Sequence, residues 1–185
     1  VIFNVEGVTD LNLDAATIAG IFKGDITKWN DAAIVALNPE ANLPAANITA
    51  VHRSDDSGTT KNFSKYLAET AGDIWDGEVS DTFPYSSGEG ASGTSGVIDA
   101  VTNGTGTIGY ADASKAGDLV SAAIKVGDAW VEHSAEAAAA ILPISTPVEG
   151  RTETDMAVDL NRTTTDAGVY PLVLVSYLVG CNDYE

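Results

Sequence analysis

The sequence predicts an α/β fold, in which helices flank one mainly parallel or mixed sheet. Short apolar segments with strand character alternate along the chain with segments in which apolar residues recur at helical spacing. The chain has 185 residues, 44% of them hydrophobic, which is enough to bury the core of one domain. We therefore expect residues 1–185 to form a single α/β unit.

The first half of the chain contains two strand signals and three helix signals. Asp14 stands at an N-cap position, apolar residues follow at helical spacing, and Gly24 marks the end of that helix. In order, the predicted elements are a strand over 1–5, a helix over 14–24, a short helix over 31–37, a strand over 48–53 and a helix over 61–71.

The second half opens with the most glycine-dense segment, 86–96, which we interpret as a flexible loop or a cap. Ser134 followed by Glu136 indicates a helix start. The predicted elements are a helix from about 97, a strand over 107–110, one or two helical turns over 111–116, a strand over 119–126 and a helix over 135–142. Residues 143–165 are weakly patterned, whereas 170–179 gives the strongest strand signal of the chain.

The composition is strongly acidic, with 27 acidic and 9 basic residues and a formal charge of −18. Such a surface repels nucleic acid and anionic lipid, so we expect neither as a partner. It does not exclude an anion site, because at physiological salt the Debye length is about 8 Å and a pocket responds mainly to its own walls. The single Cys181 and the two histidines have no metal-ligand spacing, so we expect no metal and no cofactor.

No apolar run reaches the length of about 18 residues that a transmembrane helix needs, so no membrane span is expected in this chain. The sequence opens directly on a strand, without an initiator Met, a signal peptide or a basic leader. We interpret the chain as a piece of a longer polypeptide whose targeting signals lie elsewhere.

The polar side chains with most functional promise lie in the turn His52-Arg53-Ser54-Asp55-Asp56-Ser57-Gly58-Thr59-Thr60. A strand that enters a helix through such a turn exposes backbone N–H groups at the positive end of the helix dipole, where oxyanions bind. Arg53 offers a planar guanidinium, and Ser57 and Thr59 offer hydroxyl donors. Gly58 has no side chain to block the approach to the backbone N–H groups of Gly58 and Thr59.

Asp55 has two roles open to it. It holds the guanidinium of Arg53 in position, or it accepts a proton that the ligand still carries, which would favour a protonated oxyanion over sulfate. The Arg53-x-Asp55 spacing favours the first role.

Other readings of the same turn fit less well. A P-loop requires lysine where Thr94 stands after the glycines of 88–93. A serine hydrolase requires Gly-x-Ser-x-Gly and a base, yet two aspartates precede Ser57 and His52 is the only nearby imidazole. An aspartyl phosphotransferase requires a carboxylate where Ser57 follows Asp55. Without any ligand, the same residues form an ordinary helix cap and a surface ion pair.

Several ordered motifs resemble one family. Residues 53–59 resemble the Arg-x-Asp-x-Ser-Gly-Thr ligand loop of the phosphate-binding proteins that serve ABC phosphate importers. Residues 18–31 are similar to the family segment that ends in I-x-x-W-x-D, and 36–39, 106–110 and 170–172 follow in family order. The resemblance covers nearly the whole chain, and 174–178 is similar to the Gram-positive, actinobacterial type of the family.

The resemblance implies one lobe of a type II periplasmic-binding-protein-like fold, with a mixed sheet flanked by helices. Residues 1–185 would be the second ligand-binding lobe, with 1–7 and 170–185 as strands near the hinge to a missing first lobe. Arg53, Ser57, Gly58 and Thr59 would contact phosphate, and Asp55 would be the partner of Arg53. Asp56 departs from the family, which has a small residue there, and its charge would weaken binding unless it points to solvent.

The resemblance therefore implies a protein that binds inorganic phosphate, performs no catalysis and delivers its ligand to an ABC permease. The full-length protein would be extracellular and lipid-anchored at the cell surface, or periplasmic. One alternative is an enzyme of phosphate esters that uses Ser57 or Asp55. Another is a surface or adhesion domain that has kept the fold without the ligand.

Overall fold

The computed structural model describes residues 1–181, and its centre is a mixed five-stranded sheet of order β4-β3-β5-β1-β6. Its strands are β1 (Ile2–Asn4), β3 (Thr49–Arg53), β4 (Glu89–Ala91), β5 (Thr107–Gly109) and β6 (Val120–Ser121). β3 runs parallel to β4 and β5, whereas β1 runs antiparallel to β5 and β6. β3 and β1 therefore point in opposite directions, and their carboxyl ends lie at opposite ends of the sheet's strands.

Two smaller sheets accompany this one. β2 (Asn12–Leu13), β7 (Ala123–Val126) and β8 (Ala129–Val131) form a three-stranded sheet, and β9 (Thr146–Pro147) pairs with β10 (Val158–Asp159). The helices are α1 (Ala15–Lys23), α2 (Ala32–Leu37), α3 (Gly58–Thr70), α4 (Gly93–Asn103) and α5 (Ala135–Ala139), with 3-10 turns η1 (Ala113–Lys115) and η2 (Leu142–Ile144).

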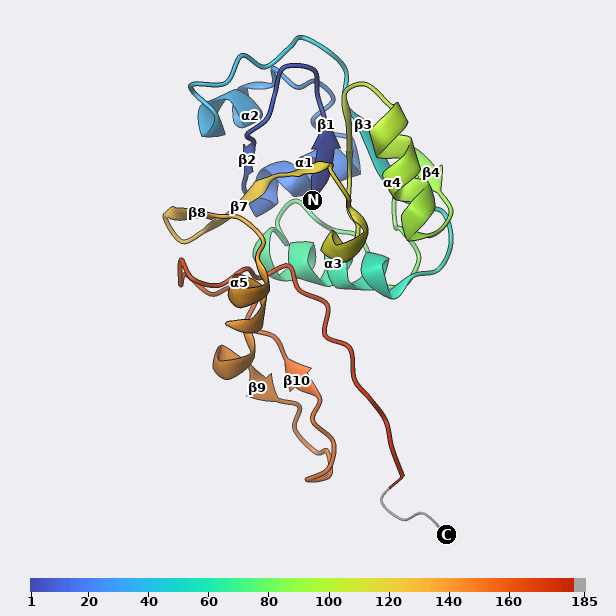
Figure 1. The fold of residues 1–185 in the computed structure, drawn as a ribbon, viewed down its shortest axis with the longest axis vertical. Coiled ribbons are helices and arrows are strands. Elements are labelled where there is room, and N and C mark those ends of the chain that lie inside the picture. Colours follow the sequence, from blue (N-terminus) through green and yellow to red (C-terminus); the bar gives the residue numbers. More distant parts are fainter. Residues whose placement is uncertain (182–185) are drawn as a thin grey trace.

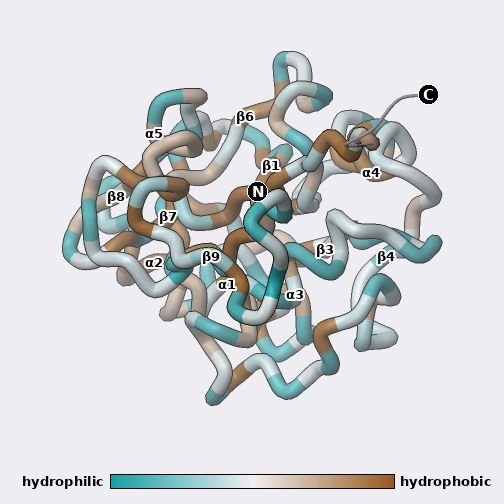
Figure 2. Tube along the Cα trace, turned by 90° about the horizontal axis from the view of Figure 1, so that it is seen from below, coloured by the Kyte–Doolittle hydropathy of each residue, from teal (hydrophilic) through white to brown (hydrophobic). Residues whose placement is uncertain are grey.

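Helices cover both faces of the main sheet (Figure 1). Because side chains alternate along a strand, Phe3 and Ile108 face the large core that includes α1 and α3. Ile2 and Val51 face the smaller cluster that includes α4 residues. In Figure 2 the hydrophobic stretches gather at β1, β7 and α1. These findings confirm the predicted α/β fold with a mixed sheet flanked by helices.

The predicted helix ends are confirmed in the first part of the chain. Asp14 Oδ1 accepts a hydrogen bond from Thr17 N at 2.8 Å, which caps α1. The helix ends at Gly24 with a φ of 93°, a left-handed conformation that favours glycine. Asp31 caps α2 in the same way, through Ala33 N at 2.9 Å.

One predicted strand is wrong. The strand expected over 119–126 is two strands in different sheets, separated at Ala122, whose N–H donates to the carbonyl of Val1 at 2.9 Å. The glycine-rich segment 86–96, interpreted as a flexible loop or a cap, forms β4 and then the N-cap and first turn of α4. The segment 143–165, for which the weak pattern predicted no element, contains the short β9–β10 pair.

The strand predicted over 170–179 is also wrong, since 170–181 forms no strand. Its apolar residues pack instead of pairing: Tyr170 is buried, and Leu172 and Val173 lie against the large core. The guanidinium of Arg162 donates hydrogen bonds to the carbonyl oxygens of Pro171 and Val173, at 3.0 and 3.4 Å. Residues 182–185, the end of the predicted hinge strand, lie outside the described residues.

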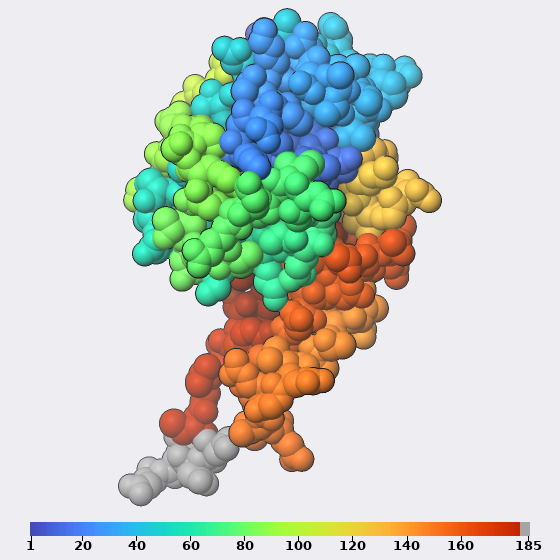
Figure 3. All heavy atoms as spheres, turned by 180° about the vertical axis from the view of Figure 1, so that it is seen from behind, coloured from blue at the N-terminus to red at the C-terminus, as the bar shows by residue number. Residues whose placement is uncertain are grey.

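Two parts of the chain after α5 extend away from the main sheet. Figures 1 and 3 show the β9–β10 pair and the end of the C-terminal segment as a projection below the body that the first part of the chain forms. Large apolar side chains are exposed along it, among them Leu142, Met156, Leu174 and Leu178.

Candidate anion-binding site

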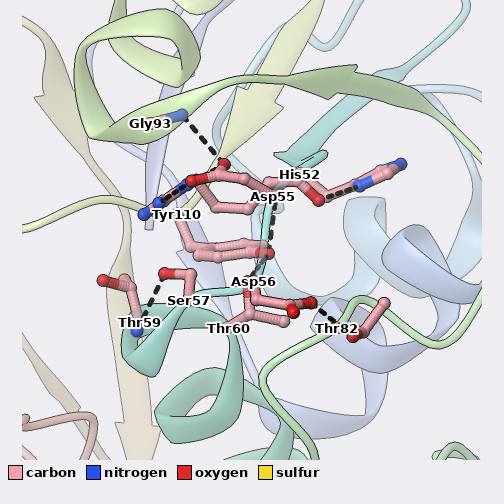
Figure 4. A network of polar contacts seen from close by, with 10 residues as sticks. His52, Asp55, Asp56, Ser57, Thr59, Thr60, Thr82, Gly93 and Tyr110 are labelled. Carbon is pink, nitrogen blue, oxygen red and sulfur yellow. Dashed lines mark hydrogen bonds and ion pairs between the residues drawn. The ribbon is translucent and has the colours of Figure 1, made fainter.

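The predicted site lies where β3 ends at Arg53 and α3 begins at Gly58. Ser57 is the N-cap, and its Oγ accepts a hydrogen bond from the backbone N–H of Thr59 at 3.1 Å. The positive end of the α3 dipole therefore points into the turn that links helix and sheet (Figure 4). The sequence-based expectation of a capped helix N-terminus at this turn is confirmed.

Arg53 and Asp55 form a two-point ion pair. Nε of Arg53 donates to Oδ1 of Asp55 at 2.7 Å, and Nη2 donates to Oδ2 at 2.5 Å. The N–H of Gly93, the first residue of α4, donates to Asp55 Oδ1 at 2.9 Å. The hydrogen bonds from Arg53 and then from Gly93 hold the pKa of Asp55 far below its usual range. Both carboxylate oxygens are thus occupied in orienting the guanidinium.

Tyr110 contacts both ends of the turn through its hydroxyl group. Its hydroxyl accepts a hydrogen bond from the backbone N–H of Arg53 at 3.2 Å and lies 2.7 Å from Thr60 Oγ1. The ring is buried and stacks on Phe63, with ring centroids 4.3 Å apart. Burial raises the pKa of Tyr110, so the phenol stays protonated at neutral pH. One hydroxyl therefore joins the end of β3 to the first turn of α3.

Asp56 faces a different part of the chain from Asp55. The hydroxyl of Thr82 donates to Asp56 Oδ1 at 2.7 Å. The backbone N–H of Ser57 donates to the carbonyl of Asp81 at 2.8 Å, so the same loop holds the turn at two points. Figure 4 shows Asp56 directed toward Thr82, whereas Ser57 and Thr59 lie on the other side of the turn.

His52 is used in packing. Its ring stacks on Phe83, with centroids 4.0 Å apart and an interplanar angle of 11°. Its Nδ1 lies 2.9 Å from the carbonyl oxygen of Arg53. These contacts direct the imidazole away from Ser57, which it would have to meet as a base.

Gly58 faces open space. A Cβ atom built at this glycine would meet no atom within 4 Å, and its φ is not in the left-handed region. Neither backbone strain nor packing therefore requires glycine here. A cavity of about 500 Å³ lies next to the turn and is lined by Thr59, Tyr110 and His133, among others. Of the five predicted ligand residues, only Thr59 reaches this cavity.

The structure thus brings the predicted residues together as two groups on one turn: Arg53 with Asp55, and Ser57 with Gly58 and Thr59. Sequence reasoning missed three residues that support the turn, namely Tyr110, Gly93 and Thr82. Tyr110 belonged to a recognised motif, but its contact depends on the pairing of β5 with β3. No local signal could have located Gly93 or Thr82.

Among residues 1–181, no group of three or more His, Cys, Asp or Glu side chains is placed to hold a metal ion. Within the same residues, no helix is both long enough and apolar enough to cross a membrane.

Comparisons with known proteins agree on one kind of relative. The family model described as a PBP superfamily domain matches residues 1–185. The phosphate-binding protein PstS 3 of Mycobacterium leprae is 37% identical over 98% of this chain and 50% of the relative. The phosphate-binding protein PstS of Xylella fastidiosa is 34% identical over 91% of this chain and 46% of the relative. The chain spans about half the length of the curated relatives it matches.

Solved structures give the same fold. A high affinity periplasmic phosphate-binding protein (PfluDING), solved with phosphate bound, matches 80% of this chain and 44% of its own, with a TM-score of 0.61 and 23% identity. A phosphate-binding protein from Stenotrophomonas maltophilia matches 80% of this chain and 43% of its own, with a TM-score of 0.56 and 23% identity. The mixed sheet and its helices are those of a type II periplasmic-binding-protein-like fold.

Proposed function

Since the chain belongs to the PBP superfamily, we propose that it binds inorganic phosphate as one lobe of the substrate-binding component of an ABC phosphate importer. The curated relatives that it matches along nearly its whole length are named phosphate-binding proteins. The chain corresponds to about half of each, so phosphate binding by this chain is our proposal.

One observation of the site carries the proposal: Asp55 fixes the guanidinium of Arg53 on the same turn whose next residues, Ser57 and Gly58, cap and begin α3. Asp55 uses Nε and Nη2, which leaves Nη1 of Arg53 for a second partner. A tetrahedral oxyanion accepts hydrogen bonds from such a donor and from helix N–H groups together. The open space in front of Gly58 lets the anion approach the backbone.

In this proposal Arg53, Ser57, Gly58 and Thr59 donate hydrogen bonds to phosphate, and Asp55 orients Arg53. We propose binding without chemical conversion. Ser57 Oγ is engaged as a helix cap, and both oxygens of Asp55 already accept hydrogen bonds from Arg53. In this arrangement Asp55 orients Arg53, and the O–H of Ser57 is left to donate to an anion.

We further propose that this lobe pairs with a first lobe that the chain does not include. The ends of the described chain, near 1–7 and 170–181, would lie toward the hinge between them. The full-length protein would act outside the cytoplasmic membrane, lipid-anchored or periplasmic, and would hand phosphate to a permease. A single lobe leaves the ligand half in water. We therefore expect a dissociation constant of about 1 mM or weaker, which corresponds to a binding free energy of about −4 kcal/mol or less.

Calorimetric titration of the chain with inorganic phosphate tests this proposal. We expect saturable millimolar binding that is lost in Arg53→Gln and kept in Arg151→Gln, a control at an exposed arginine paired with Asp155. Micromolar affinity would contradict the assignment as half of a cleft. Turnover of a chromogenic phosphomonoester that disappears in Ser57→Ala would favour the enzyme instead.

A further inference from the structure

Asp56 places a second carboxylate one residue from the cap of α3. It is exposed, and within the described part of the chain no cation lies within 4.0 Å of it. A carboxylate that turned toward the N-terminus of α3 would compete with an anion for the same N–H groups, and it would repel that anion. The direction of this side chain therefore affects what the turn can bind.

The only hydrogen bond that the described residues give to the Asp56 side chain comes from the hydroxyl of Thr82, at 2.7 Å. Thr82 lies in a loop that is fixed on both sides. Before it, the carbonyl of Asp81 accepts a hydrogen bond from Ser57 N at 2.8 Å. After it, the buried ring of Phe83 stacks on His52 at 4.0 Å. The donor for Asp56 is therefore held in place by the same turn that carries the anion site.

We propose that Thr82 is a positioning residue that holds the Asp56 carboxylate away from the proposed anion-binding site at the N-terminus of α3. Figure 4 shows the two side chains meeting on the side of the turn opposite Ser57 and Thr59. This inference rests on the proposed phosphate site, and it assigns to the 81–83 loop the control of the charge that an incoming anion meets.

Four variants test it: Thr82→Val, Asp56→Asn, the double variant, and Thr9→Val as a control. Thr9 also donates its hydroxyl to an aspartate, Asp10, at 3.0 Å. It follows β1, whose carboxyl end lies at the edge of the sheet opposite the end of β3. The readout is the dissociation constant for inorganic phosphate, measured from the amide NMR shifts of Gly58 and Thr59 at constant pH and salt.

We expect Thr82→Val to weaken phosphate binding about three- to tenfold, because the freed carboxylate can approach the anion. In the Asp56→Asn background the same substitution should change binding less than about twofold, because no charge remains to be released. Thr9→Val should leave binding unchanged. Equal weakening by Thr82→Val in both backgrounds would overturn the inference, since the effect would then be loss of loop structure and not release of charge.

Two further arms separate the other outcomes. If Asp56→Asn weakens phosphate but spares sulfate, Asp56 accepts the proton of the ligand and the inference is overturned. If Gly58 and Thr59 show no saturable response to phosphate in the unsubstituted chain, the proposed function fails.

Spectra without phosphate test the position of the carboxylate by itself. At constant pH, the amide shifts of Gly58 and Thr59 in Thr82→Val should differ from those in the double variant, because only the single variant carries a charge that can turn toward the N-terminus of α3. Identical shifts in the single and double variants would overturn the inference whatever the affinity for phosphate.

Discussion

Arg53 and Asp55 meet through two hydrogen bonds, Nε to Oδ1 at 2.7 Å and Nη2 to Oδ2 at 2.5 Å. The Arg53 side chain is 12% exposed, and the Asp55 side chain is 41% exposed. The carboxylate thus faces water on one side and fixes a nearly buried guanidinium on the other. The pair fixes the orientation of a donor on the turn that leads into α3, which a flexible lone arginine would not do.

Asp55→Asn should weaken phosphate binding about tenfold, because an amide cannot pair both guanidinium nitrogens as acceptors and Arg53 loses its fixed orientation. Calorimetry measures this change. Asp76→Asn is the matched control, because Asp76 is an exposed acid paired with Lys23 at 3.0 Å. Equal affinities for Asp55→Asn and the unsubstituted chain would contradict the orienting role.

Asp55 should also make the free energy of unfolding depend on pH in the acid range. Its pKa in the folded chain lies below the ordinary value of 3.8, so its contribution is complete above that value and is lost as pH falls toward the folded pKa. The difference in unfolding free energy between the unsubstituted chain and Asp55→Asn should therefore shrink below about pH 4. Urea denaturation at a series of pH values measures it, and a difference that grows on acidification would contradict the sign.

Tyr110→Phe should destabilise the chain by about 1–3 kcal/mol, because the N–H of Arg53 and the hydroxyl of Thr60 lose a buried partner. Tyr85→Phe is the control, since its hydroxyl donates to the exposed Asp76 and water can replace it. Urea denaturation should show the smaller loss in Tyr85→Phe. A loss in Tyr110→Phe no larger than in the control would contradict the supporting role of Tyr110.

Gly58→Ala separates a functional glycine from a structural one. The added methyl group meets no atom within 4 Å, so stability should stay equal or rise by up to about 1 kcal/mol. Phosphate binding should fall, because the methyl group occupies the approach to the helix N–H groups. Gly96→Ala within α4, where the nearest contacts are 3.6 Å away, should leave binding unchanged. Strong destabilisation by Gly58→Ala would contradict the proposed reason for this glycine.

Arg162→Met should loosen the C-terminal segment from the body. The guanidinium is buried and donates to Pro171 O at 3.0 Å and to Asn62 Oδ1 at 2.5 Å. Losing hydrogen bonds from a charged donor should cost about 2–3 kcal/mol and make 170–174 an early site of proteolysis. Arg151→Met, at an exposed arginine, is the control. An unchanged cleavage pattern in Arg162→Met would contradict the proposal that Arg162 holds the C-terminal segment against the body.

Local signals predicted the ends of α1 and the start of α2 well, because caps such as Asp14 and Gly24 act within a few residues of themselves. The segment 170–179 shows where such signals fail. Its apolar run predicted a strand, yet a strand also needs a free sheet edge beside it with which to pair. In the structure Tyr170 is buried in the core, and Arg162 donates hydrogen bonds to two carbonyl oxygens of the segment. Sequence reasoning can see that a segment is apolar, but not whether a partner strand exists.

The same limit applies to the site. The residues of one turn, Arg53 to Thr59, could be read together because chain connectivity keeps them close. Tyr110, Gly93 and Thr82 reach that turn through sheet pairing and loop packing, which no local pattern encodes. The direction of Asp56, left open by the sequence, follows from the position of Thr82.

The most direct test of the central claim follows the amide NMR signals of Gly58 and Thr59 while inorganic phosphate is added. Shifts that saturate in the millimolar range in the unsubstituted chain, and vanish in Arg53→Gln, would agree with an oxyanion seated between Arg53 and the start of α3. Signals that do not respond to phosphate, or that respond equally in Arg53→Gln, would contradict it.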